Sequence, residues 1–232
     1  DPPCERNTET TVVQALHLMN SPNLNRKVTS DDGRAAALAK SDKPSAAIVE
    51  ASDAAYVDLA VDLPRGAEAR LFRSREEPLS RGWRQLDCFP MLQMVASTAS
   101  MQVSEVGTLL SEADSAAMAD LVAITKPGPF GPRTPLLGRY FGVRNGARLL
   151  AMAGERMLLP GYVELSAICA HPEARGRGYA AGLTLQLMRL AFDRGDVPFL
   201  HVRTDNATAV ALYRRLGFET RRELVVTWRR PL

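Results

Sequence analysis

The chain has 232 residues, of which 46% are hydrophobic and 24% are charged, and its formal net charge is +3. These proportions are those of an ordinary globular protein that is long enough to bury a sizeable core. The net charge is too small to indicate nucleic-acid binding, no apolar run reaches the length of a membrane span, and no charged-then-apolar segment opens the chain.

The cysteines and histidines are too few and too scattered to form a disulfide framework or a metal site. We therefore expect a protein of a reducing compartment, the cytoplasm, that binds no metal. These residues are Cys4, Cys88, Cys169, His17, His171 and His201.

Residues 1–50 predict a small, mainly helical appendage. Apolar side chains recur at helical spacing in residues 12–19, and alanines fill a second short segment, with polar loops between the two. Residues 51–100 are ambiguous, although residues 89–95 are apolar enough for a strand. This part is interpreted as a partial α/β unit packed beside the main domain.

Residues 101–232 alternate strands with helices and form the predicted main domain, of class α/β. Its clearest local signals are an N-cap cluster at Ser111 to Asp114, the Asn145-Gly146 turn of a hairpin and the Asn206 N-cap. In chain order, the expected elements are a strand (103–109), a helix (to 124), a hairpin (140–144 and 147–155), a strand (from 162), a helix (to 192), a strand (198–203), a helix (to 216) and one or two last strands (218–229).

One stretch, residues 162–182, organises this domain. Its first half alternates like a strand, which predicts one side made of Val163, Leu165, Ala167 and Cys169, and the other of Tyr162, Glu164, Ser166 and Ile168. His171-Pro172 ends the strand, because proline cannot continue a ladder. Apolar residues then recur at helical spacing through Phe192, so the glycines of Arg175-Gly-Arg-Gly-Tyr-Ala180 lie at a helix N-terminus.

This glycine-rich turn has the properties of an anion site. The first amides of a helix have no intrahelical partner and carry a partial positive charge. Glycines let a phosphate approach those amides, and Arg175 and Arg177 can pair with it. From His171 onward, eleven arginines stand against six acids, which favours a polyanionic small ligand. We interpret the turn as a pyrophosphate cradle for coenzyme A.

A dinucleotide-binding loop is the rival interpretation. Gly176-Arg-Gly-Tyr-Ala-Ala181 satisfies the G-x-G-x-x-A pattern, and Asp193 and Asp196 lie near its acidic position. In a Rossmann unit, however, the glycines follow the strand directly. Here four residues intervene, and about fifty residues remain, which is too few for a second half-domain. An ordinary strand–helix turn is the third reading of the loop alone.

A second motif, Asn206-Ala-Thr-Ala-Val-Ala-Leu-Tyr-Arg-Arg-Leu-Gly-Phe218, follows the first with strands on both sides. In the two motifs and their separation, residues 101–232 resemble the GNAT family of acetyltransferases, and most closely its FR47-like branch. The resemblance implies a mixed, splayed β-sheet flanked by helices. It also implies that acetyl-CoA is held between the strands that end at Cys169 and Arg203.

The resemblance further implies roles for single residues. Backbone groups of the strand pair with the pantetheine arm, the amides of the turn take the pyrophosphate, and Asn206 faces the pantetheine or the acceptor. Tyr213 is the acid, and Glu164, eleven residues before Arg175, is the base. The implied cofactor-binding residues are Ile168, Cys169, Ala170, Arg175, Gly176, Arg177, Gly178, Tyr179, Ala180 and Asn206.

The chemistry needs a base because acyl transfer requires a neutral amine. Deprotonating a lysine-type amine of pKa about 10.4 at pH 7 costs roughly 4.6 kcal/mol, whereas an α-amino group costs only about 1 kcal/mol. Glu164 fills that role directly or through a water; otherwise it anchors a cationic acceptor by its charge. His201, on the neighbouring strand, is the second candidate for the base.

Two other residues and one loop also have proposed roles. Tyr213 returns a proton to the departing thiolate, or it only packs in its helix. Cys169 is expected to be a buried, inert thiol rather than a nucleophile. The proline-rich loop of residues 127–133 is expected to overhang the acceptor site, with Phe130 and Arg133 as its contacts.

The sequence thus predicts an acetyl-CoA-dependent N-acyltransferase that moves an acetyl group to a primary amine of a small molecule or a peptide by direct attack. The alternatives are a catalytically inactive CoA-binding regulatory module and a dinucleotide enzyme. Residues 1–50 also resemble the C-terminal end of a domain of unknown function found in large planctomycete proteins, through Cys4 and residues 10–20. No function is carried over from that likeness.

Overall fold

A computed structural model describes residues 45–46, 52–63, 65–97 and 105–232. The strands are β1 (Ser45–Ala46), β2 (Ala69–Arg73), β3 (Trp83–Ala96), β4 (Thr108–Leu109), β5 (Tyr140–Asn145), β6 (Arg148–Leu159), β7 (Tyr162–Ala170), β8 (Val197–Arg203) and β9 (Phe218–Pro231). The helices are α4 (Asp53–Asp62), α5 (Ser115–Thr125), α6 (Tyr179–Phe192) and α7 (Ala207–Arg215), with short 3₁₀ turns η1 (Glu112–Asp114), η2 (Thr134–Leu137) and η3 (Pro172–Ala174).

The described strands form one mixed sheet in the order β1-β2-β9-β3-β8-β7-β6-β5-β4. The last strand, β9, lies between β2 and β3 and is antiparallel to both. Residues 69–96 therefore extend the sheet of the main domain rather than forming a sheet of their own. The predicted appendage of residues 1–50 lies outside the described residues, apart from the two residues of β1, and so does the start of the strand predicted over 103–109.

The local signals of the sequence act as expected in the helices. The Ser111 amide donates to the Asp114 carboxylate at 2.6 Å, which closes the turn before α5. The Asn206 side chain accepts from the Ala209 amide at 3.2 Å and caps α7. Gly217 has φ +87°, so it ends that helix in a left-handed conformation that glycine adopts without strain.

The predicted hairpin is present, but its turn is one residue further along. Asn145 pairs with Arg148, so the two turn residues are Gly146 and Ala147. Gly146 has φ +59°, which suits a two-residue turn that begins with glycine. Strand β6 also runs four residues beyond the predicted end at Glu155.

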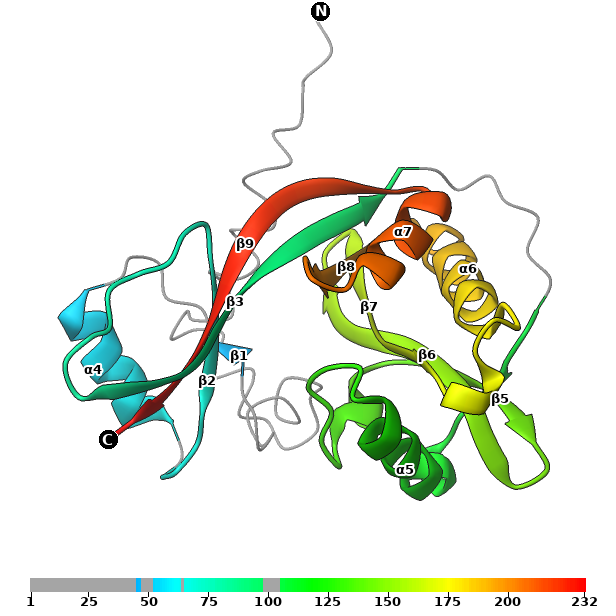
Figure 1. Cartoon of the computed structure of the whole chain (residues 1–232), viewed down its shortest axis with the longest axis horizontal. Coiled ribbons are helices and arrows are strands. Elements are labelled where there is room, and N and C mark those ends of the chain that lie inside the picture. Colours follow the sequence, from blue (N-terminus) through cyan, green and yellow to red (C-terminus); the bar gives the residue numbers. More distant parts are fainter. Residues whose placement is uncertain (1–44, 47–51, 64, 98–104) are drawn as a thin grey trace, which may run out of the picture.

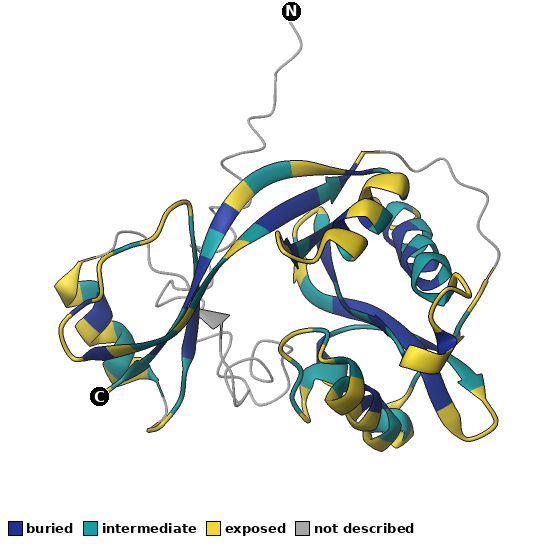
Figure 2. Ribbon diagram, viewed as in Figure 1, coloured by how far each residue is buried: buried dark blue, intermediate teal, exposed yellow. Residues whose placement is uncertain are grey.

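Helices cover both faces of the sheet. Helices α6 and α7 pack on one face, in the largest cluster of buried apolar side chains. Figure 2 shows buried positions along the strands and on the inner side of α6. Helix α5 packs on the opposite face, called here the α5 face, through Met118 and Leu121. Helix α4 packs at the far end of the sheet through Tyr56 and Trp83. Within the part of the chain that the structure describes, no helix is long and apolar enough to cross a membrane.

The strand alternation predicted for β7 is wrong beyond Ser166. Val163 and Leu165 pack toward α6, but Ala167 and Cys169 lie on the α5 face. The cause is a β-bulge, in which two β7 residues oppose a single residue of β6 between the pairs Ser166–Gly154 and Cys169–Met152. Ala167 has φ +53° there. An L-residue in that conformation carries about 1–2 kcal/mol of strain, and such strain often marks a functional site.

The sheet also curls on itself. The ring of Phe72 on β2 lies 5.0 Å from the ring of His201 on β8, although β9 and β3 lie between these strands. Three interstrand spacings in a flat sheet would separate them by about 14 Å. Strands β3 and β9 arch between the two ends of the molecule (Figure 1), and this curvature brings Phe72 of β2 to His201.

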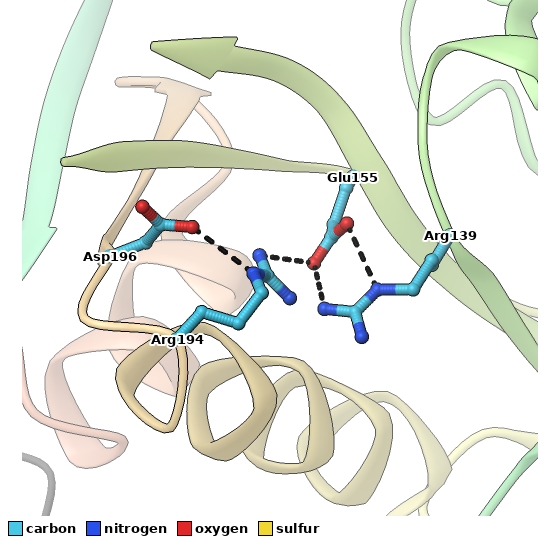
Figure 3. A network of polar contacts seen from close by, with 4 residues as sticks. All are labelled: Arg139, Glu155, Arg194 and Asp196. Carbon is cyan, nitrogen blue, oxygen red and sulfur yellow. Dashed lines mark hydrogen bonds and ion pairs between the residues drawn. The ribbon is translucent and has the colours of Figure 1, made fainter. Parts of the chain in front are cut away.

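A buried ion-pair network fixes the end of α6 against β6 (Figure 3). Glu155, which is 1% exposed, accepts at 2.9 Å from Arg139 and at 2.9 Å from Arg194, which follows α6. Arg194 also pairs with Asp196 at 3.1 Å. Two guanidinium groups thus satisfy one buried carboxylate, as a buried charge requires, and they join three segments that are distant in the sequence.

Candidate active site

Strands β7 and β8 separate soon after they meet. They pair in parallel only where Tyr162 to Glu164 face Val197 to Phe199. Beyond Glu164, β8 continues its ladder with β3, while residues 165–170 of β7 have no strand partner on that side among the described residues. Free peptide groups on such an edge can pair with an extended ligand as an added strand would. This is the splay that the sequence predicts.

The glycine turn lies at the end of this edge. Gly176 and Gly178 have φ of +76° and +78°, and a side chain at either position would meet no atom within 4 Å. Helix α6 makes its first hydrogen bond from the Gly182 amide to the Gly178 carbonyl at 2.9 Å. Within the described residues, the amides of residues 176–181 therefore have no protein acceptor. The exposed turn, with Arg175 and Arg177 also exposed, fits a pyrophosphate.

On the α5 face, a chain of polar side chains crosses five neighbouring strands. Arg221 donates to Gln93 Oε1 at 2.6 Å, so the Gln93 amide nitrogen faces His201 Nε2 at 3.0 Å. His201 Nε2 therefore accepts, and Nδ1 carries the hydrogen that it donates to Glu164 Oε1 at 2.8 Å. Arg156 Nε donates to Glu164 Oε2 at 2.9 Å. The donors thus fix both the tautomer and the orientation of the imidazole.

Glu164 is held as a carboxylate. It is 1% exposed, and burial by itself raises its pKa. The charge of Arg156 and the hydrogen bond from His201 outweigh burial and lower the pKa to about 2. Glu164 is therefore ionised throughout the physiological range, and both of its oxygens are engaged.

The sequence reasoning missed four members of this centre, one of which is Arg221 of the polar chain. Arg156 lies at a β-bulge of β6, between the pairs Glu155–Leu165 and Met157–Glu164, and the bulge turns its guanidinium toward Glu164. Gln93 joins from β3. The hydroxyl of Tyr140 is buried and has no hydrogen-bond partner among the described residues, and burial raises its pKa. Of these residues, only Gln93 had a signal in the sequence, because it is a polar residue inside an apolar run.

Tyr213 lies on the other side of the gap, on α7. Its ring is buried against Phe218 at a centroid distance of 5.9 Å, and the structure shows no hydrogen bond to its hydroxyl within the described residues. Burial, and then the nearby Cys169, raises the pKa of Tyr213 to about 12, so it stays protonated. Cys169 is itself buried, and burial raises the pKa of its thiol.

The remaining predicted residues are spread around the gap. Ile168 and Ala170 lie on the free edge of β7 and pack toward α6. Asn206 is exposed and uses its side-chain oxygen to cap α7. Phe130 packs edge-on against Tyr140 at 6.0 Å, which places the proline-rich loop over the α5 face. His171 is buried and accepts from Arg148 at 2.7 Å. Arg133 is exposed, and the first residues of α6 are Tyr179 and Ala180.

Comparison with known proteins agrees with this geometry. The family model of FR47-like proteins matches residues 140–227. A solved structure from Novosphingobium aromaticivorans, described as a GNAT-family acetyltransferase, is 34% identical and superposes with a TM-score of 0.75, covering 83% of this chain and 86% of that one. The chain belongs to the GNAT family.

Other GNAT relatives match over shorter stretches. N-alpha-acetyltransferase RimI of Mycobacterium tuberculosis is 42% identical over 83 residues, which are 34% of this chain and 51% of that protein. Mycothiol acetyltransferase of Saccharomonospora viridis is 43% identical over 58 residues, which are 25% of this chain and 19% of that protein. The chain thus spans about half or less of the length of the curated relatives it matches.

Across residues 45–46, 52–63, 65–97 and 105–232, no three His, Cys, Asp or Glu side chains are arranged to hold a metal ion. In this GNAT site the groups from Gln93 to Arg156 are satisfied by one another, whereas the Tyr140 hydroxyl has no partner among the described residues.

Proposed function

We propose that this protein transfers the acetyl group of acetyl-CoA to a primary amine, by direct attack of the amine on the thioester. A C–N bond forms and the C–S bond breaks; the amine loses a proton, and the CoA thiolate takes one up. The observation that carries the proposal is the free edge of β7, residues 165–170, which leads into a helix N-terminus with unpaired amides. Family membership and the acetyltransferase relatives support it.

The proposed CoA site uses backbone groups more than side chains. Peptide groups of Ile168, Cys169 and Ala170 would pair with the pantetheine arm, and amides of residues 175–180 would take the pyrophosphate, with Arg175 and Arg177 as its counter-charges. Asn206 would line the same gap from the start of α7. Its capping bond uses only the side-chain oxygen, so its side-chain nitrogen can donate to the ligand. When bound, acetyl-CoA supplies the activated acyl group.

We propose that Glu164 acts through its charge and through His201. Protonating a carboxylate of pKa about 2 at pH 7 costs about 7 kcal/mol, from 5 units at 1.36 kcal/mol each. A fixed negative charge instead stabilises the positive charge that develops on the attacking nitrogen. It also holds the imidazole by the Nδ1–H bond. Both nitrogens of His201 are engaged, one by Gln93 and the other by Glu164, so the proton leaves to a water.

Tyr213 is the proposed group on the thiolate side. A pKa of about 12 lies some 3.5 units above that of a thiol of about 8.5, so complete proton transfer is uphill by roughly 5 kcal/mol. A hydrogen bond from the hydroxyl to the departing sulfur stabilises the developing thiolate without that penalty. Cys169 is not proposed as an acyl carrier, because burial keeps its thiol protonated.

We place the reaction in the cytoplasm, since both cysteines of the described residues, Cys88 and Cys169, are free thiols. The test is a mass-spectrometric screen of acetyl-CoA with pooled amines, amino acids and peptides. We expect an acetylated product and stoichiometric release of CoA. Tight CoA binding with no product across all acceptor classes would instead identify a CoA-binding regulatory module.

A further inference from the structure

Arg70 on β2 is a buried cation with no anionic partner among the described residues. It is 8% exposed, and its guanidinium stacks over the ring of Trp228 at 4.2 Å. Trp228 is in turn held by a hydrogen bond to Glu68 at 3.0 Å. Within the part of the chain that the structure describes, Arg70 makes no hydrogen bond and no ion pair. Placing a charge there without an anion beside it is costly, and its N–H donors are free to bind an anion from elsewhere.

The curl of the sheet directs Arg70 toward the polar centre on the α5 face. Arg70 and Phe72 are two residues apart on a strand, so they point to the same side and leave β2 about 7 Å apart. Phe72 touches His201, at 5.0 Å between ring centroids. Burial lowers the pKa of Arg70; the charge of Glu68 opposes this, and Arg156 lowers it further. Arg70 therefore lies within electrostatic range of the group that holds Glu164.

Charge and shape both select the kind of anion. A planar guanidinium presents two parallel N–H donors that match a carboxylate. Stacking on Trp228 fixes the plane of the guanidinium group, so less side-chain entropy is lost when an anion binds. One unpartnered guanidinium neutralises one negative charge, which suits a carboxylate better than a doubly charged phosphate.

We propose that the amine acceptor carries a carboxylate, which binds Arg70 while its amine faces Glu164 and His201. This inference rests on the proposed acetyl transfer and names its substrate class. The spacing along β2 favours an acceptor in which several bonds separate the amine from the carboxylate. Such an acceptor is either a small amino acid or a peptide whose acidic side chain lies near its N-terminus.

The test compares matched acceptors that differ only in the carboxylate. One arm pairs γ-aminobutyrate with butylamine, and the other pairs a tripeptide that begins with Glu with the same tripeptide beginning with Gln. Each is assayed with wild type, with Arg70→Gln and with Arg84→Gln, an exposed arginine on β3, as the control. In wild type and in Arg84→Gln, kcat/KM favours the carboxylate member. In Arg70→Gln that preference falls about 10- to 100-fold.

The two arms distinguish the two kinds of acceptor. A preference in the first arm alone identifies a small amino acid, and a preference in the second arm alone identifies an acidic peptide. Arg70→Gln should also melt at a higher temperature, since it removes an unpaired buried charge; a purely structural arginine would lower the melting temperature and leave acceptor preference unchanged. Equal turnover of both members by wild type would overturn the inference and leave acetyl transfer standing.

If wild type acetylates no amine, the proposed function fails. A binding measurement then tests separately whether Arg70 binds a carboxylate. The probe is N-acetyl-γ-aminobutyrate, titrated calorimetrically into CoA-loaded wild type and Arg70→Gln. Binding to wild type that Arg70→Gln weakens at least tenfold supports the site, and equal or absent binding overturns it.

Discussion

Replacing Gly178 by glutamate tests the proposed pyrophosphate cradle. The position has φ +78°, so any side chain adds about 1–2 kcal/mol of backbone strain, although it meets no neighbouring atom. The new carboxylate would lie about 5 Å from a ligand with two negative charges. At an effective dielectric constant of about 40 to 80, the repulsion is about 1.7 to 3.3 kcal/mol, or roughly 20- to 300-fold in Kd.

Gly195 provides a matched control at the other end of the same helix. It has φ +79°, and a side chain there also meets nothing within 4 Å, so Gly195→Glu carries the same strain and the same charge. The assay is isothermal titration calorimetry with CoA, together with the melting temperature of each variant. We expect both variants to lose similar stability and only Gly178→Glu to lose CoA affinity. Equal Kd values for the two variants would refute the cradle.

The other predictions concern the buried polar residues. Tyr213→Phe should lower kcat about 10- to 100-fold at unchanged stability, because the hydroxyl makes no hydrogen bond to the described residues; an unchanged kcat in steady-state assays would remove it from the mechanism. The pKa of Glu164 is lowered from 4.5 to about 2, so its contribution to stability, about 3 kcal/mol, is present above about pH 5 and is lost as the pH falls toward 2. Glu164→Gln should flatten that part of the acid-unfolding curve and, by leaving Arg156 unpaired, destabilise the fold by about 3–5 kcal/mol at pH 7. Glu155→Gln removes the ion pairs with Arg139 and Arg194 and should destabilise by less in urea denaturation, because Arg194 keeps Asp196 and both guanidinium groups reach solvent, while the KM for acetyl-CoA stays the same.

These stability predictions have their own controls. Glu223→Gln changes an exposed acid on β9 and should leave the acid-unfolding curve unchanged. If Glu164→Gln retained the full wild-type loss of stability between pH 5 and pH 2, the ion pair with Arg156 would not account for it.

The elements that the sequence predicted correctly are those whose signals are local. The caps at Ser111 and Asn206, the glycine turn before α6 and the helical spacing behind it act within a few residues. Their hydrogen bonds close over short loops, so neighbouring residues suffice to place them. The Asn145-Gly146 turn was displaced by one residue because pairing along the whole hairpin, with its bulge after Val143, sets the register.

What the sequence determined by itself is the order of elements and a glycine turn at the start of α6. The tertiary structure alone decided which side chains meet. The bulge at Ala167 reverses the faces of β7, the bulge at Arg156 turns a guanidinium onto Glu164, and the curl of the sheet brings Arg70 toward His201's side of the molecule. The bulges depend on how β6 pairs with β7 along its whole length, and the curl depends on pairing between strands about a hundred residues apart, such as β3 with β8. Neither is contained in the local pattern of one strand.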